Sequence, residues 1–314
     1  MKSPTLSVIV PMFNEEDNVF PLYNELKLVL EETLKKNIIS AYEVIVINDG
    51  STDRTQPMLE TLSINEKDLS VIQFRKNFGQ TPALKAGFSK AKGDLIVTMD
   101  GDMQNDPRDI PRLIEKIERY DVVSGWRVNR RDKFGKRVSS RIMNSLRQIL
   151  IGDHLHDYGC SLKIYRKECS KDLQLFGELH RYITAYLHIR GYKIGELKVN
   201  HRPRFKGKTK YNLKRGLNGI FDLFYLKFWA SYSTRPLHFF GRLGFYQWLL
   251  AFLIAIEQII KALVINELKF GPLLALASLL VMTGLLFIMF GFMFEIMSRL
   301  YFKEEEIYSV KKII

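Results

Sequence analysis

A stretch of 25 consecutive residues without a charged side chain, Phe270 to Phe294, constrains this chain more than any other feature. A helix that crosses a bilayer needs about 20 predominantly apolar residues, so this segment predicts a transmembrane helix. A weaker apolar segment, about 237–263, carries Arg242 and Glu257 about 22 Å apart along a helix, and we expect them near opposite interfaces. We therefore predict a two-helix transmembrane hairpin and a short tail within residues 236–314.

The distribution of lysine and arginine around this hairpin predicts its orientation. Basic residues are dense before the first span and present after the second, whereas the connecting loop has little beyond Lys261 and Lys269. Cytoplasmic loops carry an excess of lysine and arginine, so we expect both termini and the first 212 residues in the cytoplasm. Residues 213–235 form an amphipathic, aromatic segment, which predicts a helix that lies in the membrane interface or packs on the globular domain.

Residues 1–212 alternate short apolar runs with helical patterns. The apolar runs predict strands over 6–10, 43–47, 69–74, 94–99, 121–124, 162–165 and 193–199. The helical patterns predict helices over 18–34, 51–62, 81–91 and 109–120, the second of them capped by Ser51 or Thr52. Nearly uniform apolar strands that alternate with helices indicate an α/β domain with a mainly parallel sheet and helices on both faces.

Polar clusters follow four of the predicted strands. They are Phe13-Asn14-Glu15, Asn48-Asp49-Gly50-Ser51, Asp100-Gly101-Asp102 and Gly125-Trp126-Arg127. In parallel sheets, ligands bind outside the carboxyl ends of the strands. Any single cluster is compatible with ordinary turn chemistry, because Asp-Gly is a common turn pair. Together the four clusters predict one site at this edge of the sheet.

The triplet Asp100-Gly101-Asp102 is the candidate metal site. Two carboxylates on a loop that Gly101 keeps open suit a hard divalent cation, Mg²⁺ or Mn²⁺, and Gln104 and Asp106 add oxygen atoms nearby. The triplet alone also occurs on solvated loops, but its place after an apolar strand favours a metal site. Neither a dinucleotide-binding G-x-G-x-x-G after the first strand nor a P-loop motif occurs, so those nucleotide sites are unsupported.

The net charge of +13 predicts an anionic partner: nucleic acid, an anionic membrane or a phosphorylated substrate. The basic residues form no recognised nucleic-acid-binding motif, so we do not expect a nucleic-acid partner. Cys160 and Cys169 have neither the spacing of a zinc site nor that of a disulfide framework, which favours two free thiols in a reducing compartment.

Four segments closely resemble the family 2 glycosyltransferases of the GT-A fold. They are LSVIVPMFNE (6–15), VIVINDGSTDRT (44–55), RKNFGQTPALKAG (75–87) and DLIVTMDGDMQNDP (94–107). Within this family, the D-x-D-x-Q-x-x-P pattern, the Gly-Trp-Arg and Asp-Tyr-Gly-Cys segments and the terminal helix pair resemble the polyprenyl-phosphate glycosyltransferases. That group includes dolichol-phosphate mannose synthases and undecaprenyl-phosphate glucosyl- and aminoarabinosyltransferases. The resemblance covers essentially the whole chain and is strongest through residue 130.

The resemblance implies roles for individual residues. The nucleoside pocket would be lined by Pro11, Phe13, Glu15, Ile47 and Asp49, although family members often have Tyr at the position of Phe13 and Asp at that of Asn48. The cation and the donor diphosphate would be bound by Asp100, Asp102 and Gln104, with Gly101 and Arg127 at the donor site and Arg204 and Lys210 as a basic pair on a loop over the diphosphate. The acceptor phosphate would meet Arg137 and Arg141, which lie one helical turn apart; the alternative is a solvated basic face. Asp157 would orient the acceptor or act as a base; the alternatives are helix capping and an ion pair with a nearby arginine.

The resemblance thus implies inverting, metal-dependent transfer of a hexosyl group from a nucleotide-sugar to undecaprenyl or dolichyl phosphate. It favours a UDP-sugar over GDP-mannose, and a role in the cell envelope of a bacterial or archaeal plasma membrane. One alternative is a polysaccharide synthase that acts on a sugar hydroxyl, but its usual Gln-x-x-Arg-Trp motif is absent. A non-catalytic, basic, membrane-tethered binding protein is another, against which the metal motif argues. The helical pattern around Ile142 to Ile151 fits either a homo-oligomer interface or the core.

Overall fold

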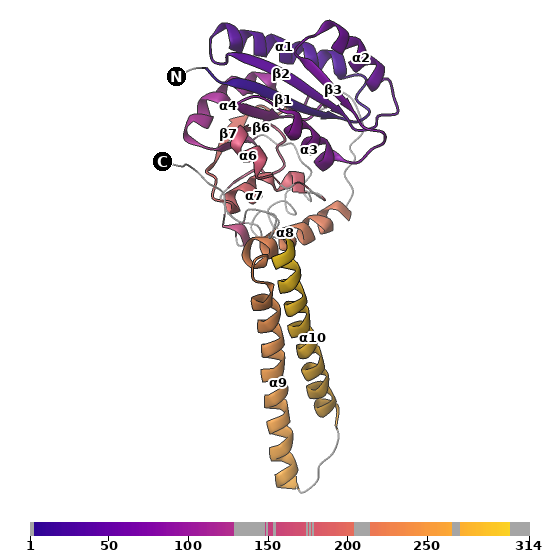
Figure 1. The fold of residues 1–314 in the computed structure, drawn as a ribbon, viewed down its shortest axis with the longest axis vertical. Coiled ribbons are helices and arrows are strands. Elements are labelled where there is room, and N and C mark those ends of the chain that lie inside the picture. The colour runs from indigo at the N-terminus through magenta and orange to yellow at the C-terminus, as the bar shows by residue number, and fades with distance from the viewer. Residues whose placement is uncertain are drawn as a thin grey trace. The chain divides into compact units, whose positions relative to one another are not determined.

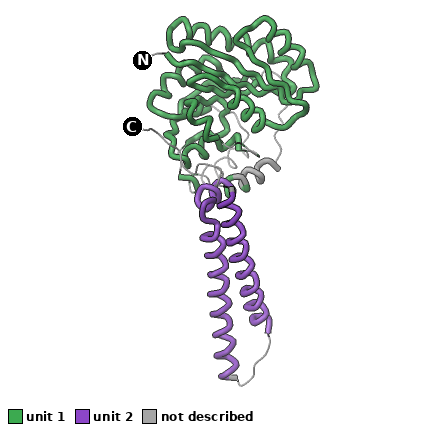
Figure 2. The backbone as a smooth tube through the Cα atoms, viewed as in Figure 1, with its two compact units in different colours: residues 1–224 green, residues 225–314 purple. Residues whose placement is uncertain are grey.

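The computed structural model describes residues 3–128, 148, 150–152, 155–173, 175, 177, 179–203, 214–265 and 271–301. The chain divides into two compact units, residues 1–224 and residues 225–314 (Figure 2). The first unit contains the sheet, and the described residues of the second are mainly helical.

A seven-stranded sheet, in the order β3-β2-β1-β4-β6-β5-β7, forms the centre of the first unit (Figure 1). Its strands are β1 (Thr5–Met12), β2 (Ala41–Asn48), β3 (Leu69–Gln73), β4 (Leu95–Thr98), β5 (Val122–Arg127), β6 (Lys163–Arg166) and β7 (Ile194–Val199). Strand β6 runs antiparallel to both of its neighbours, and every other pair is parallel. The predicted α/β fold with a mainly parallel sheet is confirmed. The reversed direction of β6 is a feature that the strand pattern did not indicate.

Helices cover both faces of the sheet, because successive side chains of a strand point to opposite faces. On one face, Val8 and Val10 of β1 pack in a core cluster with Leu22 and Leu26 of α1 (Val19–Lys35). On the other face, Gly87 of α3 (Gln80–Lys90) lies against side chains of β1 and β2. The described part of this unit also contains α2 (Thr55–Asn65), η1 (Pro107–Asp109), α4 (Ile110–Lys116), η2 (Ile117–Arg119), α6 (Lys167–Lys171), η3 (Leu179–Arg181) and α7 (Ile183–Ile189).

Helix α2 begins at Thr55, so the predicted caps at Ser51 and Thr52 are wrong. These two residues instead join the loop after β2 to the loop after β1. The Ser51 hydroxyl accepts a hydrogen bond from the Asn14 backbone N–H (2.9 Å), and Asn14 Oδ1 accepts one from the Thr52 N–H (2.8 Å). The Thr55 hydroxyl accepts a further bond from the Glu15 N–H (2.9 Å). The two loops are thereby fixed to each other at the carboxyl edge of the sheet.

The second unit contains a pair of long helices, α9 (Pro236–Ile265) and α10 (Pro272–Tyr301), and α8 (Lys214–Tyr232) crosses the boundary between the units. Both α9 and α10 are long and apolar enough to cross a membrane. Gly244 and Gly284 lie at their contact, and small residues allow close approach of helix backbones. The Trp248 Nε1–H donates to the Val281 carbonyl (3.0 Å) across the pair. The predicted hairpin of apolar helices is therefore confirmed.

Candidate active site

The loop after β4 carries the acidic motif and lies close to the end of β1. A Cβ atom at Gly101 would stand 2.7 Å from Met12 Cγ and 3.2 Å from the Pro11 carbonyl oxygen, so this approach requires glycine. Met103 adopts a left-handed backbone (φ 60°), and Asp102 Oδ1 accepts a hydrogen bond from the Gln104 N–H (3.2 Å). The chain therefore turns sharply after the second aspartate, which is itself buried.

Two side chains hydrogen-bond the carboxylate of Asp100 and orient it. The Gln80 side-chain amide donates to Asp100 Oδ1 (2.7 Å), and the Ser161 hydroxyl also hydrogen-bonds Asp100. Loss of hydration, followed by the nearby charge of Asp102, raises the pKa of the Asp100 carboxyl. Two carboxylates held close together in poorly hydrated surroundings are a combination that a bound cation would stabilise.

The donor set fits a hard divalent cation that is shared with a substrate. The described residues contain no group of three or more His, Cys, Asp or Glu side chains able to hold a metal ion by themselves. Mg²⁺ is commonly bound through one or two protein carboxylates plus substrate phosphates, and Mg²⁺ and Mn²⁺ both prefer oxygen ligands. Asp100, Asp102 and the amide of Gln104 supply such oxygens on one loop.

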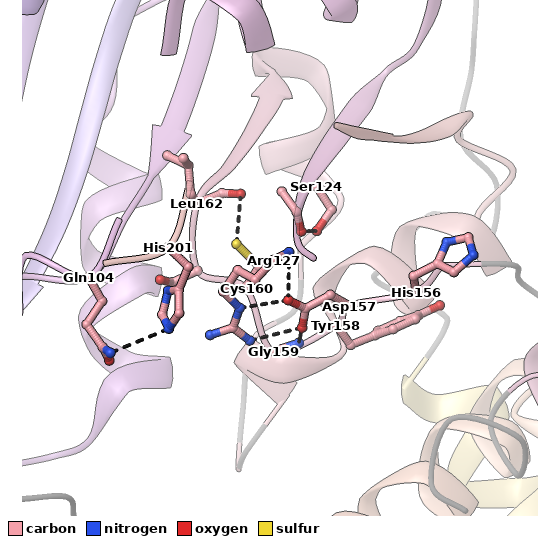
Figure 3. Close-up of polar contacts among 12 residues, drawn as sticks. Gln104, Ser124, Arg127, His156, Asp157, Tyr158, Gly159, Cys160, Leu162 and His201 are labelled. Carbon is pink, nitrogen blue, oxygen red and sulfur yellow. Dashed lines mark hydrogen bonds and ion pairs between the residues drawn. The ribbon is translucent and has the colours of Figure 1, made fainter. Parts of the chain in front are cut away.

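The segment after β7 holds the end of this loop in place. The Arg202 N–H donates to the Gln104 carbonyl (2.9 Å), and the Gln104 side-chain amide lies 3.5 Å from His201 Nε2 (Figure 3). The Arg202 guanidinium makes two 2.7 Å bonds to Glu25 and one 2.7 Å ion pair with Asp106. Arg202 therefore holds Gln104 through its backbone N–H, while its side chain ties the same loop down at Asp106.

A buried ion pair joins Arg127, at the end of β5, to Asp157. The guanidinium Nε and Nη2 atoms donate to the two carboxylate oxygens at 2.7 and 2.9 Å, as Figure 3 shows. Asp157 also accepts from the backbone N–H groups of Arg127 (3.2 Å) and Gly159 (3.1 Å). Burial alone would lower the pKa of Arg127, but the hydrogen bonds and charge of Asp157 outweigh it and raise that pKa. The guanidinium is a fixed positive charge.

Glu196 of β7 supports the segment that carries Asp157. Its Oε1 atom accepts from the backbone N–H groups of His156 (2.7 Å) and Asp157 (3.1 Å), and its Oε2 atom lies 2.7 Å from His156 Nδ1. The His156 ring stacks on Trp126 at a centroid distance of 4.2 Å. Strands β5 and β7 therefore hold the segment of His156 and Asp157, through backbone hydrogen bonds and a ring contact of His156.

Lys163 places a second cation inside this region. It is buried in β6, and its ammonium donates to the carbonyl oxygens of Tyr158 (3.3 Å) and Cys160. Burial lowers the pKa of this lysine. Its two carbonyl contacts hold the loop of residues 158–160 against the sheet, next to the Arg127–Asp157 pair.

The loop between β3 and α3 is bound by Asp49, at the end of β2. Asp49 Oδ1 accepts from the Phe78 N–H (2.7 Å), and Oδ2 accepts from the Gly79 N–H (2.9 Å) and the Asn77 side-chain amide (3.0 Å). This arrangement leaves the Phe78 ring exposed. The Asp49 side chain thus anchors a neighbouring loop, a role that the sequence did not reveal.

Residues 7–174 match the sequence profile of Glycosyl transferase family 2. The chain belongs to glycosyl transferase family 2. It is 37% identical over 312 residues to the dodecaprenyl-phosphate galacturonate synthase of Rhizobium johnstonii, covering 97% of this chain and 91% of the relative. It is 32% identical over 299 residues to the undecaprenyl-phosphate 4-deoxy-4-formamido-L-arabinose transferase of Photorhabdus laumondii, covering 94% and 87%. This family 2 glycosyltransferase is therefore similar to polyprenyl-phosphate glycosyltransferases along nearly its whole length.

The fold of this family 2 glycosyltransferase is the GT-A type that its sequence predicted. It resembles the crystal structure of glucosyl-3-phosphoglycerate synthase from Mycobacterium tuberculosis in complex with Mn²⁺ and uridine-diphosphate-glucose, with a TM-score of 0.54. The two chains share 17% sequence identity, and the match covers 71% of this chain and 79% of the other. At this level of identity the likeness supports the fold alone.

The structure describes some of the residues predicted for the site of this family 2 glycosyltransferase and leaves others out. Asp100, Asp102, Gln104 and Arg127 lie at the carboxyl ends of β4 and β5. Asp157 forms the ion pair that was one of its predicted alternatives. Arg137, Arg141, Arg204, Lys210 and most of the helix predicted around 142–151 lie outside the described residues.

Ile47 is one of the residues expected to line the nucleoside pocket. Its side chain is fully buried, and its Cδ1 atom lies next to Gly87 of α3. It points away from the face that carries Val46, because neighbouring strand residues alternate. The Ile47 side chain is therefore part of the core between the sheet and α3.

Several residues that shape the site were not predicted from the sequence. They are Gln80, Ser161, Lys163, Glu196 and Arg202. Gln80 stands at the start of a helix that follows a strand, and this position was a usable signal. Lys163 is a charged residue within an apolar strand, which also marks it. Glu196 and Arg202 carry no local signal, because their partners are distant in sequence.

The two cysteines give a first test of this packing. Both are buried, and burial raises the pKa of Cys160 to about 11 and, with the charge of Asp121, that of Cys169 to about 12. Since the thiolate is the reactive form, we expect neither to react with a thiol reagent at pH 8 in the native protein, and both to react after denaturation. Ile64→Cys, at an exposed position of α2, serves as the reactive control. Fast labelling of either native cysteine would contradict the described core.

Proposed function

We propose that this enzyme transfers a sugar from a nucleotide-sugar to a polyprenyl phosphate, and so makes a lipid-linked sugar and a nucleoside diphosphate. The observation that carries the proposal is the 37% identity, over 97% of the chain, with dodecaprenyl-phosphate galacturonate synthase. That similarity includes α9 and α10, which are long and apolar enough to hold the enzyme in the membrane that contains a lipid acceptor. The alternatives from the sequence, a polysaccharide synthase and a non-catalytic binding protein, lack comparable support.

The donor would bind across the carboxyl edge of the sheet. Pro11, Phe13, Glu15 and Asp49 would surround the nucleoside, and Asp100, Asp102 and Gln104 would hold Mg²⁺ or Mn²⁺. Such a cation, when bound, neutralises charge on the leaving nucleoside diphosphate. Arg127, oriented by Asp157, adds a preorganised positive charge for the same leaving group, and preorganised charge is often the largest catalytic contribution. On the resemblance alone, Arg204 and Lys210 would also contact the diphosphate.

The acceptor needs little activation. A phosphate monoester has a second pKa of about 6, so it is largely a dianion at neutral pH. One of its oxygens forms the bond to the anomeric carbon while the bond from that carbon to the diphosphate breaks, which inverts the configuration. No proton has to be removed, and this agrees with an Asp157 whose two oxygens are engaged by Arg127. Arg137 and Arg141 would meet the acceptor phosphate.

The positive charge of the chain supports a cytoplasmic catalytic unit. A net charge of +13 suits a protein that handles two phosphorylated substrates beside an anionic membrane surface. Lysine and arginine flank the apolar helices on the side of the two termini, as expected for cytoplasmic segments. We therefore place the first unit on the cytoplasmic face of a bacterial or archaeal plasma membrane.

Transfer of label into lipid tests the proposed function. Purified full-length protein in detergent would receive Mn²⁺, a short polyprenyl phosphate and one labelled donor: a UDP-linked uronic acid, UDP-4-deoxy-4-formamido-L-arabinose, UDP-glucose or GDP-mannose. We expect a UDP-sugar to label the organic phase, and the matched polyprenol without phosphate to remain unlabelled. Equal labelling of the polyprenol, or label only in polysaccharide, would contradict phosphate as the nucleophile.

A further inference from the structure

Gln80, the first residue of α3, makes a contact that none of the roles above explains. Its side-chain amide donates to Asp100 Oδ1 at 2.7 Å. An ionised carboxylate only accepts hydrogen bonds, so the amide must present its NH₂ group to Asp100. The contact therefore fixes one oxygen of the first aspartate of the acidic motif from outside the loop that carries it.

Two independent contacts hold Gln80 in position. On its amino-terminal side, Asp49 binds the three preceding residues, 77–79, through two backbone N–H groups and one side-chain amide. On its carboxyl-terminal side, the buried Thr81 hydroxyl lies 2.8 Å from His180 Nδ1 in η3. Gly79 has a positive φ of 97°, which lets the chain turn directly from the anchored loop into the helix. The chain is thus held on both sides of Gln80.

The same loop connects two parts of the donor site. Asp49 ends β2 and Asp100 follows β4, and β1 lies between these strands in the sheet. Residues 77–80 are bound to Asp49 at one end and hold Asp100 at the other. In other metal sites, a side chain that hydrogen-bonds a metal ligand orients that ligand. Loss of such a side chain typically costs 10–100-fold in metal affinity or activity.

We infer that Gln80 is a positioning residue that holds the Asp100 carboxylate ready for a divalent cation. This inference rests on the proposed function, because the cation is part of it. In this inference Gln80 acts through Asp100, the residue that its side-chain amide contacts. Removal of its N–H donor leaves the Ser161 hydroxyl and the charges of Arg127 and Lys163 to act on the Asp100 carboxylate.

Direct measurement of Mn²⁺ binding tests this role. Gln80→Met keeps the length of the side chain and removes the donor. Mn²⁺ would be titrated into the purified full-length chain, alone and with UDP, and free Mn²⁺ followed by electron paramagnetic resonance. We expect about 10-fold weaker binding than in the unmodified chain, with half-maximal activity at a correspondingly higher Mn²⁺ concentration and a largely unchanged kcat at saturating Mn²⁺. Gln73→Met, at the exposed end of β3, is the matched control and should bind Mn²⁺ normally.

The outcomes separate the inference from the function on which it rests. If the unmodified chain binds Mn²⁺ and Gln80→Met binds it equally well, Gln80 has no positioning role. If the unmodified chain binds no Mn²⁺ in either arm, the proposed metal site fails and the inference with it. Gln80→Ser, too short to reach Asp100 and well suited to the first turn of a helix, replaces Gln80→Met if that variant does not fold.

Discussion

Replacement of Asp102 by Asn is expected to reduce sugar transfer by about 100–1000-fold or more and to leave the fold intact. Asn matches Asp in size, so the buried site keeps its packing. The change removes one of the two carboxylates that would hold the cation opposite the leaving diphosphate, and loss of a single electrostatic contact of this kind commonly costs 10²–10³ in kcat. Initial rates at several Mn²⁺ concentrations and a circular dichroism spectrum would measure the two parts of the prediction.

A matched variant shows whether the effect is specific to the site. Asp68→Asn makes the same chemical change at an exposed residue just before β3, at the opposite edge of the sheet, and should retain full activity. Full activity of Asp102→Asn would disprove the metal assignment. Equal losses in both variants would point to a general effect of charge on the protein.

The ion pair between Arg127 and Asp157 is expected to contribute strongly to stability. Its side chains are only 13% and 4% exposed, so Arg127→Met leaves a buried carboxylate without its partner. Such a change typically costs 3–5 kcal/mol, because the remaining charge has lost both its counter-ion and its water. For a unit of this size we expect the midpoint of thermal unfolding to fall by roughly 10 °C. Thermal unfolding of the detergent-solubilised protein would measure this shift.

An exposed ion pair provides the comparison. Lys36 and Glu32 are 62% and 65% exposed, and Lys36→Met should change stability by less than about 0.5 kcal/mol. The double variant Arg127→Met, Asp157→Leu should recover much of the lost stability, since neither charge of the pair is left without the other, yet should stay impaired in transfer. A double variant as unstable as Arg127→Met alone would show that the loss came from packing and not from the unpaired charge.

The sequence predicted the fold well because its signals are local. Each strand from β1 to β5 is an apolar run, and the polar residues at the strand ends, including Asp100 and Arg127, lie at one edge as expected. The partners of these residues were harder to predict. Asp157 comes 30 positions after Arg127, and Gln80 comes 20 positions before Asp100. No periodicity encodes such pairs, because the tertiary fold decides them.

Ile47 and Asp49 illustrate a second limit. Both are expected at the nucleoside pocket by position in a resembling motif, which stays a prediction, and a motif does not specify where each side chain points. The alternation of the strand turns Ile47 into the core, while the side chain of Asp49 is directed at the loop of residues 77–79. Roles carried over by motif therefore need the geometry of the individual side chain.

The antiparallel strand β6 has a consequence for synthesis of the protein. Residues Leu95–Thr98 of β4 pair on one side with β6, at Lys163–Arg166, which the ribosome makes much later. Until then the nascent chain exposes an unpaired edge of β4, and an open edge is a template for wrong pairing with other chains. Fragments that end before Lys163 should therefore depend on chaperones and tend to aggregate, whereas the completed sheet protects its own edge.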